Sequence, residues 1–520
     1  MKKIYTLFTA LWMVTVVLGQ RLNITAGSQS YSFPVSEITS SSPAMFSNGT
    51  SLTIGSTIIK IRKITSISVT DSSTEFSSLE NNTVSVVYSD TTATVDIADN
   101  VRDYLSIIQK GAHISIIQSD KLTEEITYKL SGTSTNGEFY MSGSYKATIE
   151  MDGLTLTNAI PLFSGAAVHI QNGKRIKVRL VSGTTSTLAD ATNGSQKGCL
   201  YIKGHAEFSQ DGTLNVTGNF NHAIKTGEYF TLRDATINVT SAVCDGINCE
   251  EYFLMESGTV CIRGTGDDGI QCDVDDTDQG STGETINHEG EDSGNIYING
   301  GTITVNCTGK DVKGIKCEGN LNIGGGTLDV SCSERKSEGL QSKGMLNITD
   351  GFITINANDD AINSAQEMTI SGGYIYARSS TNDGIDSNGN CYIKGGLIYA
   401  IGASWPEAAI DANETGKQLY ILGGTIVAIG GLDRGAILTQ PCYSASSWNE
   451  KTWYALNVGS DVFAFKTPEG GGCTLVVSGA SEPTLESGVT VSDGTSIFGG
   501  VGYISATVCD GSSVSLSLLQ

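Results

Sequence analysis

The chain has 520 residues, including 62 glycines and 7 prolines, and its 55 acidic residues outnumber 32 basic ones for a formal net charge of −23. A hydrophobic content of 39 % excludes a generally disordered chain, and glycine without a three-residue period excludes collagen. The acidic surplus argues against nucleic acid as a partner, because phosphate binding needs a concentrated basic surface. It fits partners that are neutral, cationic, or anionic with a bridging metal.

Residues 1–19 have the pattern of a secretory signal peptide. Lys2 and Lys3 precede an apolar stretch over residues 5–18, and polar sequence follows Gly19 at once. The stretch is too short for a stable membrane helix, and no internal apolar run reaches bilayer-spanning length. We therefore expect export to the periplasm, the cell surface or the medium, with no transmembrane segment in the mature protein.

Residues 20–125 are rich in serine and threonine and contain strand-like stretches such as residues 51–61. They do not follow the repeat that organises the rest of the chain. This composition predicts a small N-terminal β-rich domain.

A five-residue phrase, Asp-Gly-Ile-x-Cys or Asp-Gly-Ile-x-Ser in its clearest copies, recurs along the next part of the chain. Consecutive copies are 22 to 25 residues apart, apart from one longer step that contains an insertion starting near Asp273. The aliphatic residues of the copies are Leu200, Ile224, Ile247, Ile270, Ile315, Leu340, Ile362, Ile385 and Ile410.

Two more phrases keep this period, and both alternate apolar and polar residues as strands with one buried face do. Gly-Gly-Thr-Ile-x-Val is typified by residues 300–305, and a short strand such as residues 296–298 precedes it. The framework of leucine-rich repeats, which share the period, is absent. We predict an all-β fold, a right-handed parallel β-helix with three short strands per coil, over residues 126–465. A β-rich C-terminal cap over residues 466–520 would protect the open end of the stack.

Stacked coils place equivalent side chains in columns. Cys249, Cys272 and Cys317 share one inward column, and Cys307 and Cys332 share another. We interpret these thiols as small interior fillers, with vertical disulfides or metal binding as alternatives. Three of the 12 cysteines lie outside the regular coils and are better candidates for pairing: Cys442, Cys473 and Cys509.

Acidic residues gather at one corner of the coils. Asp386 and Asp411 are one coil apart, so their carboxylates start about 5 Å from each other, the spacing of stacked strands. Clusters of hard oxygen ligands suit calcium, and the alternative is a row of solvated acids that end strands. Further oxygen ligands at this corner are Asp359, Asp360, Asp383 and Glu407.

The insertion offers a second calcium candidate, because acids alternate along it and close on a glycine. Its spacing does not match an EF-hand, and a disordered acidic loop is the alternative. The candidate ligands are Asp273, Asp275, Asp276 and Asp278.

Aromatic residues also fall into outward columns. Exposed apolar stripes usually mean binding, and stacked phenol rings suit the faces of sugar rings. The alternatives are ordinary cross-strand packing and cover from a loop such as residues 403–407, which carries Trp405. The columns are Phe352 with Tyr374, Tyr376 with Tyr399, and Tyr392 with Tyr420.

Signals for catalysis are few. The histidines are scattered, and the HExxH and GxSxG motifs are absent. Arg378 lies on a coil next to the acidic corner, where an arginine beside calcium could serve the β-elimination of a uronate. Paired carboxylates for glycoside hydrolysis remain open as well.

The Asp-Gly-Ile phrase together with the Gly-Gly-Thr-Ile-x-Val strands resembles a family of secreted bacterial parallel β-helix proteins described as carbohydrate-binding. Residues 164–170, 221–225 and 267–271 are similar to its members, and the resemblance covers about residues 126–440. It implies a fold similar to that of pectate lyases, association with plant cell-wall polysaccharides such as cellulose and pectin, and calcium on the acidic corners. Asp267 and Asp268 then join the candidate calcium ligands.

These observations lead to one hypothesis and two alternatives. The hypothesis is a secreted β-helix that binds polysaccharide with the help of calcium and has no catalytic activity. A calcium-dependent polysaccharide lyase is the first alternative, and a structural or adhesive surface protein is the second.

Overall fold

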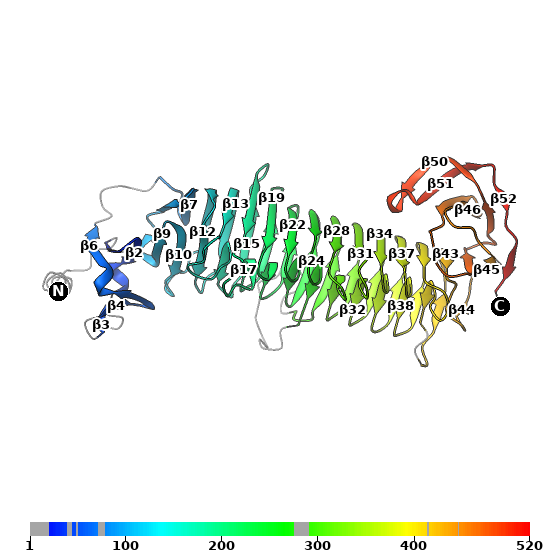
Figure 1. Ribbon diagram of the computed structural model, residues 1–520, viewed down its shortest axis with the longest axis horizontal. Helices are drawn as coiled ribbons and strands as arrows, with labels where there is room; N and C mark the ends of the chain where they lie inside the picture. The colour runs from blue at the N-terminus through cyan, green and yellow to red at the C-terminus, as the bar shows by residue number, and fades with distance from the viewer. Residues whose placement is uncertain are drawn as a thin grey trace. The chain divides into compact units, whose positions relative to one another are not determined.

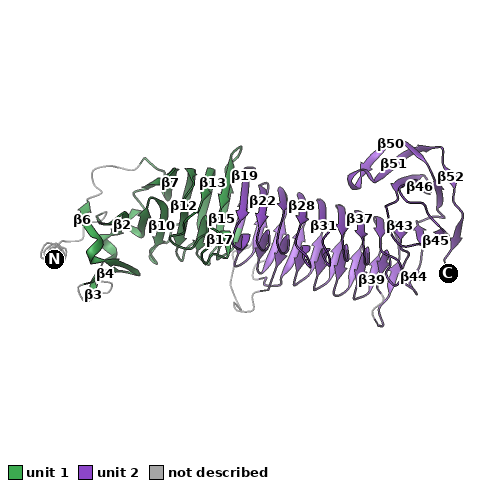
Figure 2. Cartoon of the chain, viewed as in Figure 1, with its two compact units in different colours: residues 1–206 green, residues 207–520 purple. Residues whose placement is uncertain are grey.

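The computed structural model describes residues 20–38, 44–47, 50–70, 78–274, 291–412, 415–445 and 447–519. The predicted signal peptide and the candidate ligands Asp275, Asp276 and Asp278 lie outside these residues. The chain forms two compact units, residues 1–206 and 207–520, called unit 1 and unit 2 below (Figure 2). Among the described residues, no helix is both long and apolar enough to cross a membrane.

The described chain is all-β, as predicted. Its helical content is limited to short 3-10 segments: η1 (Val35–Glu37), η2 (Ile61–Lys63), η4 (Arg102–Tyr104) and η5 (Phe498–Gly500). Each unit contains turns of a β-solenoid, which confirms the interpretation of the repeat (Figure 1).

Unit 1 changes from antiparallel to parallel pairing. Strand β1 (Arg21–Ala26) pairs antiparallel with β2 (Gln29–Pro34) and β6 (Ile64–Thr70). Strand β10 (Ala112–Gln118) pairs antiparallel with β9 (Leu105–Lys110) but parallel with β12 (Gly137–Ser142). The parallel stack continues through β14 (Val168–Gln171) and β17 (Gly198–Ile202).

Parallel stacking in unit 1 starts before residue 126, where the sequence places the first coil. Strand β7 (Thr83–Ser89) already pairs in parallel with β11 (Ile126–Ser134), and β11 pairs in parallel with β13 (Ala147–Thr157). These strands alternate buried and exposed residues but lack the Asp-Gly-Ile phrase. The periodic signal therefore does not reveal them.

In unit 2, strands of one coil pair in parallel with their equivalents in the next coil and so form ladders. The corner ladder carries the Asp-Gly-Ile phrase and pairs its aliphatic residues one above another, as in Ile247 with Ile270 and Ile362 with Ile385. Its strands are β20 (His222–Thr226), β23 (Ile247–Cys249), β26 (Ile270–Cys272), β29 (Lys313–Cys317), β32 (Glu338–Ser342), β35 (Ile362–Ser364), β38 (Ile385–Ser387) and β41 (Ile410–Asp411).

Two further series of parallel strand pairs carry the remaining phrases. One contains β21 (Phe230–Leu232), β24 (Tyr252–Met255), β27 (Asn295–Ile298), β30 (Leu321–Ile323), β33 (Leu346–Ile348), β36 (Met368–Ile370), β39 (Cys391–Ile393) and β42 (Leu419–Ile421). The other contains β19 (Thr213–Gly218), β22 (Thr236–Ala242), β25 (Thr259–Arg263), β28 (Thr302–Cys307), β31 (Thr327–Cys332), β34 (Phe352–Ala357), β37 (Tyr374–Ser379), β40 (Leu397–Ile401) and β43 (Thr425–Ile429). The inward residues are buried aliphatic side chains whose transfer out of water stabilises the stack.

The predicted register is confirmed. Asp386 lies opposite Asp411, and Tyr376 lies opposite Tyr399, as direct partners on neighbouring strands. Cys307 likewise lies opposite Cys332. All 12 cysteines are described and free, and those of the two inward columns are buried, in line with their interpretation as interior fillers.

The C-terminal part of unit 2 closes the last coil. Strand β48 (Leu475–Ser478) runs antiparallel to β43 and to β45 (Cys442–Ala445), so the edge of β43 has hydrogen-bond partners. A separate antiparallel sheet, with β44 (Ile437–Leu438) and β53 (Leu516–Leu518) outside it, contains β46 (Trp453–Val458), β47 (Asp461–Lys466), β49 (Thr484–Ser487), β50 (Thr490–Ile497), β51 (Gly502–Cys509) and β52 (Ser512–Ser513).

The glycine of the Asp-Gly-Ile phrase allows neighbouring coils to approach each other. A Cβ atom on Gly246 would lie 2.7 Å from the carbonyl oxygen of Gly269, and one on Gly314 would lie 2.7 Å from that of Gly339. Distances this short are not tolerated between a methyl carbon and a fixed backbone oxygen. The phrase therefore carries glycine for steric reasons.

Replacing Gly339 with alanine should destabilise unit 2, because the new methyl group would press on the Ile355 side chain and the Ala361 carbonyl group. We expect the free energy of unfolding to fall by about 1–3 kcal/mol. Gly173→Ala is the matched control, because nothing lies within 4 Å of the added carbon there. Denaturant unfolding of both variants measures the difference, and equal stabilities would contradict the steric argument.

Candidate functional site

In three coils of the corner ladder, a buried acid accepts a hydrogen bond from an amide side chain three residues later. Asn248 Nδ2 donates to Asp245 Oδ2 over 2.7 Å, and Asn363 Nδ2 donates to Asp360 Oδ2 over 2.9 Å. In another coil, Gln341 Nε2 donates to both carboxylate oxygens of Glu338 over 3.0 and 2.9 Å. The acid and the amide thus form a repeated pair on one corner of the solenoid.

The same acids also join one coil to the next. Asp360 Oδ1 accepts from the backbone N–H of Asp383 over 3.1 Å, and Asp383 Oδ1 accepts from that of Ala408 over 2.5 Å. Asp268 Oδ1 accepts from the N–H of Lys313 over 2.6 Å. These hydrogen bonds from backbone N–H groups to side-chain oxygen atoms help to hold neighbouring coils together.

The pattern changes at Asp383, where the residue three positions later is Asp386 instead of an amide. An ionised carboxylate cannot donate a hydrogen bond, so ionised Asp386 does not stabilise the charge of Asp383 as the Asn363 amide stabilises that of Asp360. Asp411 lies opposite Asp386 on β41. Oxygen atoms of Asp383, Asp386 and Asp411 all lie within 4.8 Å of one another. We call these three residues the carboxylate cluster.

Burial and mutual repulsion make the charged form of the cluster unfavourable. Burial, with the charges of Asp360, Asp411 and Glu407, raises the pKa of Asp383 to about 8 against the hydrogen bond from Ala408. Burial, with the charges of Asp360, Asp383 and Asp411, raises the pKa of Asp386 to about 8. Among the described residues, no lysine, arginine or histidine forms an ion pair with these carboxylates, in contrast to Glu338, which has Lys313 at 3.6 Å.

A second acidic group on the same ladder contains its own basic partners. Asp245, Asp267 and Asp268 have oxygen atoms within 4.8 Å of one another. Lys316 Nζ lies 3.5 Å from Asp268 Oδ2, and His222 Nδ1 lies 3.2 Å from Asp245 Oδ2. Burial still raises the pKa of Asp268 to about 6. This group needs a metal ion less than the carboxylate cluster does.

The other predicted metal ligands lie at the edges of these groups. Asp359 Oδ1 accepts from Asn382 Nδ2 over 2.8 Å, and Asp273 Oδ1 accepts from Gln271 Nε2 over 2.5 Å. Glu407 is half-buried, and its charge acts on Asp360, Asp383 and Asp411.

Two of the predicted aromatic pairs are accessible stacks. Tyr392 and Tyr420 lie on β39 and β42 with ring centroids 4.8 Å apart and planes 15° apart, and Lys394 Nζ lies 5.1 Å from the Tyr392 centroid. Phe352 and Tyr374 stack at 4.9 Å and 4°, and Phe352 is 46 % exposed. Both pairs offer flat apolar surface with polar groups close by.

The third pair is buried, and its prediction as an exposed surface is wrong. Tyr376 is 6 % exposed and Tyr399 is 0 % exposed. Both belong to a core that includes Phe463, Phe465 and Phe498 from the C-terminal part of unit 2. Those segments have no periodic phrase, so the sequence does not show that they cover this column.

The candidate catalytic residue Arg378 has a structural partner. Its guanidinium donates to the backbone carbonyl oxygen of Glu469 over 2.9 Å. This contact joins β37 to the chain that follows β47, so the Arg378 side chain has a structural role that does not depend on catalysis.

The structure adds Asp433 to the acidic corner, which the sequence analysis missed. Leu432 pairs in parallel with Ile410, and the Asp433 N–H donates to the Ile410 carbonyl oxygen over 2.9 Å. Asp433 thereby extends the Asp386–Asp411 column by one coil, and its charge is the largest that raises the pKa of Asp411, after burial. Its position 22 residues beyond Asp411 was the available signal, but the surrounding Gly-Leu-Asp does not match the phrase.

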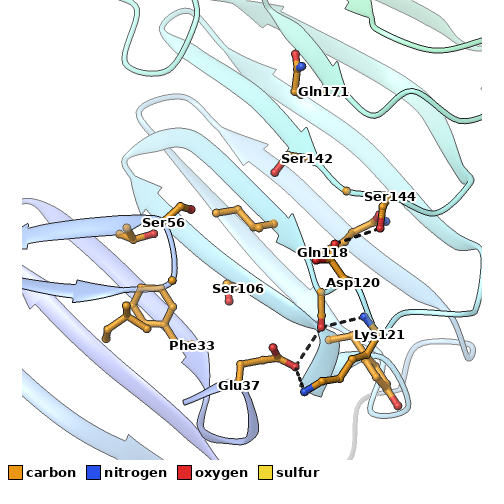
Figure 3. A pocket seen from close by; sticks show the side chains of 17 residues that line it. Phe33, Glu37, Ser56, Ser106, Gln118, Asp120, Lys121, Ser142, Ser144 and Gln171 are labelled. Atoms are coloured by element: carbon orange, nitrogen blue, oxygen red, sulfur yellow. Dashed lines mark hydrogen bonds and ion pairs between the residues drawn. The ribbon is translucent and has the colours of Figure 1, made fainter. Parts of the chain in front are cut away.

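Unit 1 also has features that the sequence analysis missed. The rings of Tyr140, His169 and Tyr201 form a column with centroid distances of 4.7 and 4.8 Å. A cavity of about 580 Å³ in the same unit has Glu37 and Lys121 on its wall, paired at 3.3 Å (Figure 3). Its lining includes none of the predicted ligand-binding or metal-binding residues.

Comparison with known proteins adds a family. A family model described as "Carbohydrate-binding domain-containing protein" matches residues 117–384, just over half of the chain. A carbohydrate-binding domain-containing protein of Acetivibrio thermocellus is 27 % identical over 139 residues, which cover 25 % of this chain and 44 % of that protein. The match thus spans less than half of the relative. A solved structure of a polysaccharide lyase-like protein from C. thermocellum, a gadolinium derivative, has 17 % identity and a TM-score of 0.36 over 68 % of this chain and 99 % of that one.

Replacing Asp386 with asparagine should stabilise the protein in the absence of divalent cations. Burial and the neighbouring carboxylates raise the pKa of Asp383 and that of Asp386 to about 8 in the folded protein, whereas the pKa of an unfolded aspartate is 3.8. The stability that these raised pKa values contribute is therefore fully present below pH 3.8 and is lost as the pH rises through about 8. The amide introduced by Asp386→Asn can donate to Asp383 as Asn363 does to Asp360, so we expect about 1 kcal/mol of added stability at pH 8.

Thermal unfolding in a chelator, followed from pH 5 to pH 8.5, measures this effect. Asp329→Asn, at an exposed carboxyl group on β31, controls for the general loss of a negative charge. A loss of stability in Asp386→Asn at pH 8, relative to that control, would contradict the assigned repulsion.

Proposed function

The chain belongs to the family of carbohydrate-binding domain-containing proteins, and we propose on this basis that it binds polysaccharide with the help of calcium and catalyses no reaction on it. The proposal includes export directed by residues 1–19, and a right-handed β-helix with three strands per coil as the scaffold. Cellulose-like or pectin-like polymers are the proposed ligands. The observation that carries the calcium part is the replacement of the amide by Asp386 in the acid–amide pattern.

The donor set fits calcium. Asp383, Asp386 and Asp411 offer only carboxylate oxygens, with Asp359, Asp360 and Glu407 next to them, and hard oxygen donors are the ligands that calcium prefers. Soft sulfur and imidazole ligands, which select zinc, do not belong to the cluster. A bound divalent cation supplies the positive charge that the side chains of the cluster lack.

The stacked tyrosines are the proposed sugar-binding surface. The pyranose ring has apolar C–H faces and hydroxyl groups at its edge. The half-buried Tyr392–Tyr420 stack leaves aromatic surface exposed for contact with these C–H groups, and Lys394 can donate to a hydroxyl or carboxylate group of the sugar. The two rings are held by neighbouring strands, so little conformational entropy is lost on binding.

Calcium should raise the unfolding temperature of the wild-type protein at pH 7.5, because a ligand that binds only the folded state stabilises it. The increase should be lost in Asp386→Asn and retained in Asp329→Asn. Differential scanning calorimetry with and without excess chelator measures both effects. If calcium raised the unfolding temperature of Asp386→Asn as much as that of the wild type, the proposal that the ion binds at the carboxylate cluster would be contradicted.

The double variant Tyr392→Ala/Tyr420→Ala should bind polysaccharide about tenfold more weakly, equal to a loss of about 1.4 kcal/mol. Affinity electrophoresis against cellulose derivatives, xylan and polygalacturonate measures the change, and Tyr104→Ala, an exposed tyrosine of unit 1, is the control. Unchanged affinity would exclude this surface.

The same samples test the alternatives. Incubation with polygalacturonate and calcium, followed by the absorbance of unsaturated products, reports β-elimination, and we expect no product. A polysaccharide lyase would release product, and would lose that activity in Arg378→Ala. If no polysaccharide binds and the protein self-associates or binds cells, the structural or adhesive alternative is favoured.

A further inference from the structure

Unit 2 contains a cavity of about 550 Å³ next to its last coil. The loop after β40, the loop after β43, and β48 all contribute to its wall. Its polar side is formed by Glu407, Asp411, Asp433 and Arg434, and its apolar side includes Leu438 and Val476. Of these residues, only Glu407 and Asp411 were candidates in the sequence, and only as metal ligands.

Trp405 lies on the wall of this cavity and is 71 % exposed, the most exposed of the large hydrophobic side chains in the described residues. The Arg434 guanidinium carbon lies 4.8 Å from the centroid of its ring. A cation over the face of an indole is an attractive contact that limits the movement of the ring. Exposing a large apolar side chain to water is unfavourable for the folded protein. Exposed apolar surface that is held in place is therefore characteristic of binding sites.

Hydrogen-bond acceptors face the same cavity. Asp411 is fixed on β41, and Asp433 is fixed by its backbone hydrogen bond to Ile410. Carboxylates accept from hydroxyl groups and cannot donate when charged. The cavity thus combines a flat apolar wall with acceptors that are held by strands, the usual composition of a small-ligand site.

This combination selects a class of ligand. Sugar hydroxyl groups can donate to the carboxylates, and the C–H face of a pyranose ring can pack on the face of the Trp405 indole that Arg434 does not cover. Even with a calcium ion on the carboxylate cluster, the negative charges of that cluster, Glu407 and Asp433 outnumber the positive charges of the ion and Arg434. A glycan with carboxylate groups of its own would therefore be repelled. We propose that this cavity is a second carbohydrate site that binds a neutral sugar unit between Trp405 and the carboxylates of Asp411 and Asp433.

The inference rests on the proposed polysaccharide-binding function and narrows its ligand to neutral chains at this place. It does not require the tyrosine stack, because Tyr392 and Tyr420 are absent from the lining. The two surfaces can therefore be tested by separate variants.

The experiment titrates full-length protein, in buffer with calcium, with cellohexaose, xylohexaose, mannohexaose and trigalacturonate. Binding is followed by tryptophan fluorescence and by isothermal calorimetry. We expect at least one neutral oligosaccharide to bind and to change the fluorescence, and trigalacturonate to bind more weakly. Trp405→Ala should lower the affinity for the neutral ligand about tenfold, and Asp433→Asn should lower it in the same direction.

Controls separate this site from the fold and from the tyrosine surface. Trp405→Ala should retain the wild-type unfolding temperature and its shift with calcium, because the side chain is mostly exposed. Tyr420→Ala should retain the fluorescence change with the neutral oligosaccharide. Asp329→Asn should behave as wild type.

Three results would overturn the inference. Neutral oligosaccharides could bind Trp405→Ala as tightly as wild type, trigalacturonate could be the preferred ligand, or Asp433→Asn and Trp405→Ala could both leave calorimetric binding unchanged. In each of these cases the wild-type protein still binds a glycan, and the proposed function stands. If the wild-type protein binds no polysaccharide at all, the proposed function and this inference fail together.

Discussion

Parallel stacking of coils in register is the constraint on which the rest of unit 2 depends. Neighbouring strands lie about 4.8 Å apart, so each side chain of the corner ladder lies close to its equivalents above and below. Such a column favours apolar side chains inside the solenoid. Where acidic side chains recur, their mutual repulsion has to be offset by hydrogen-bond donors or positive charges. The acid–amide pairs at Asp245, Glu338 and Asp360 supply such donors. A cluster such as Asp383, Asp386 and Asp411 arises when one member of the pattern changes.

Much of the fold could be predicted from the sequence because the register is encoded in a repeat. The recurrence of the Asp-Gly-Ile phrase and its variants every 22 to 25 residues is enough to place Asp386 opposite Asp411, and the structure agrees. The burial of Tyr376 and Tyr399 could not be predicted in this way. It depends on contacts with Phe463, Phe465 and Phe498, which are distant in sequence and belong to strands without a period. Periodicity thus predicts what lies along a column and leaves open what covers it.

The acidic corner shows the same division. The sequence indicates which acids share a corner, but it does not distinguish an acid that holds two coils together from one that lacks a partner. Within the described residues, the Asp360 side chain accepts from an amide and from a backbone N–H, whereas the Asp386 side chain accepts from the Asn363 amide alone, which Asp360 also uses. Asp433 was missed because the last turn keeps the spacing and loses the phrase. The hydrogen-bond partners of each carboxylate distinguish the acids that join two coils from the acids of the candidate metal site. These partners are known only from the three-dimensional structure.

The reversed direction of β48 against β43 has an evolutionary consequence. An antiparallel strand ends the growth of a parallel ladder, since the next coil would need a partner that runs the other way. Gene duplication can therefore add or remove a coil upstream in steps of about two dozen residues without altering this terminus. The number of coils, and with it the length of the outer faces, can then change while the closing sheet stays the same.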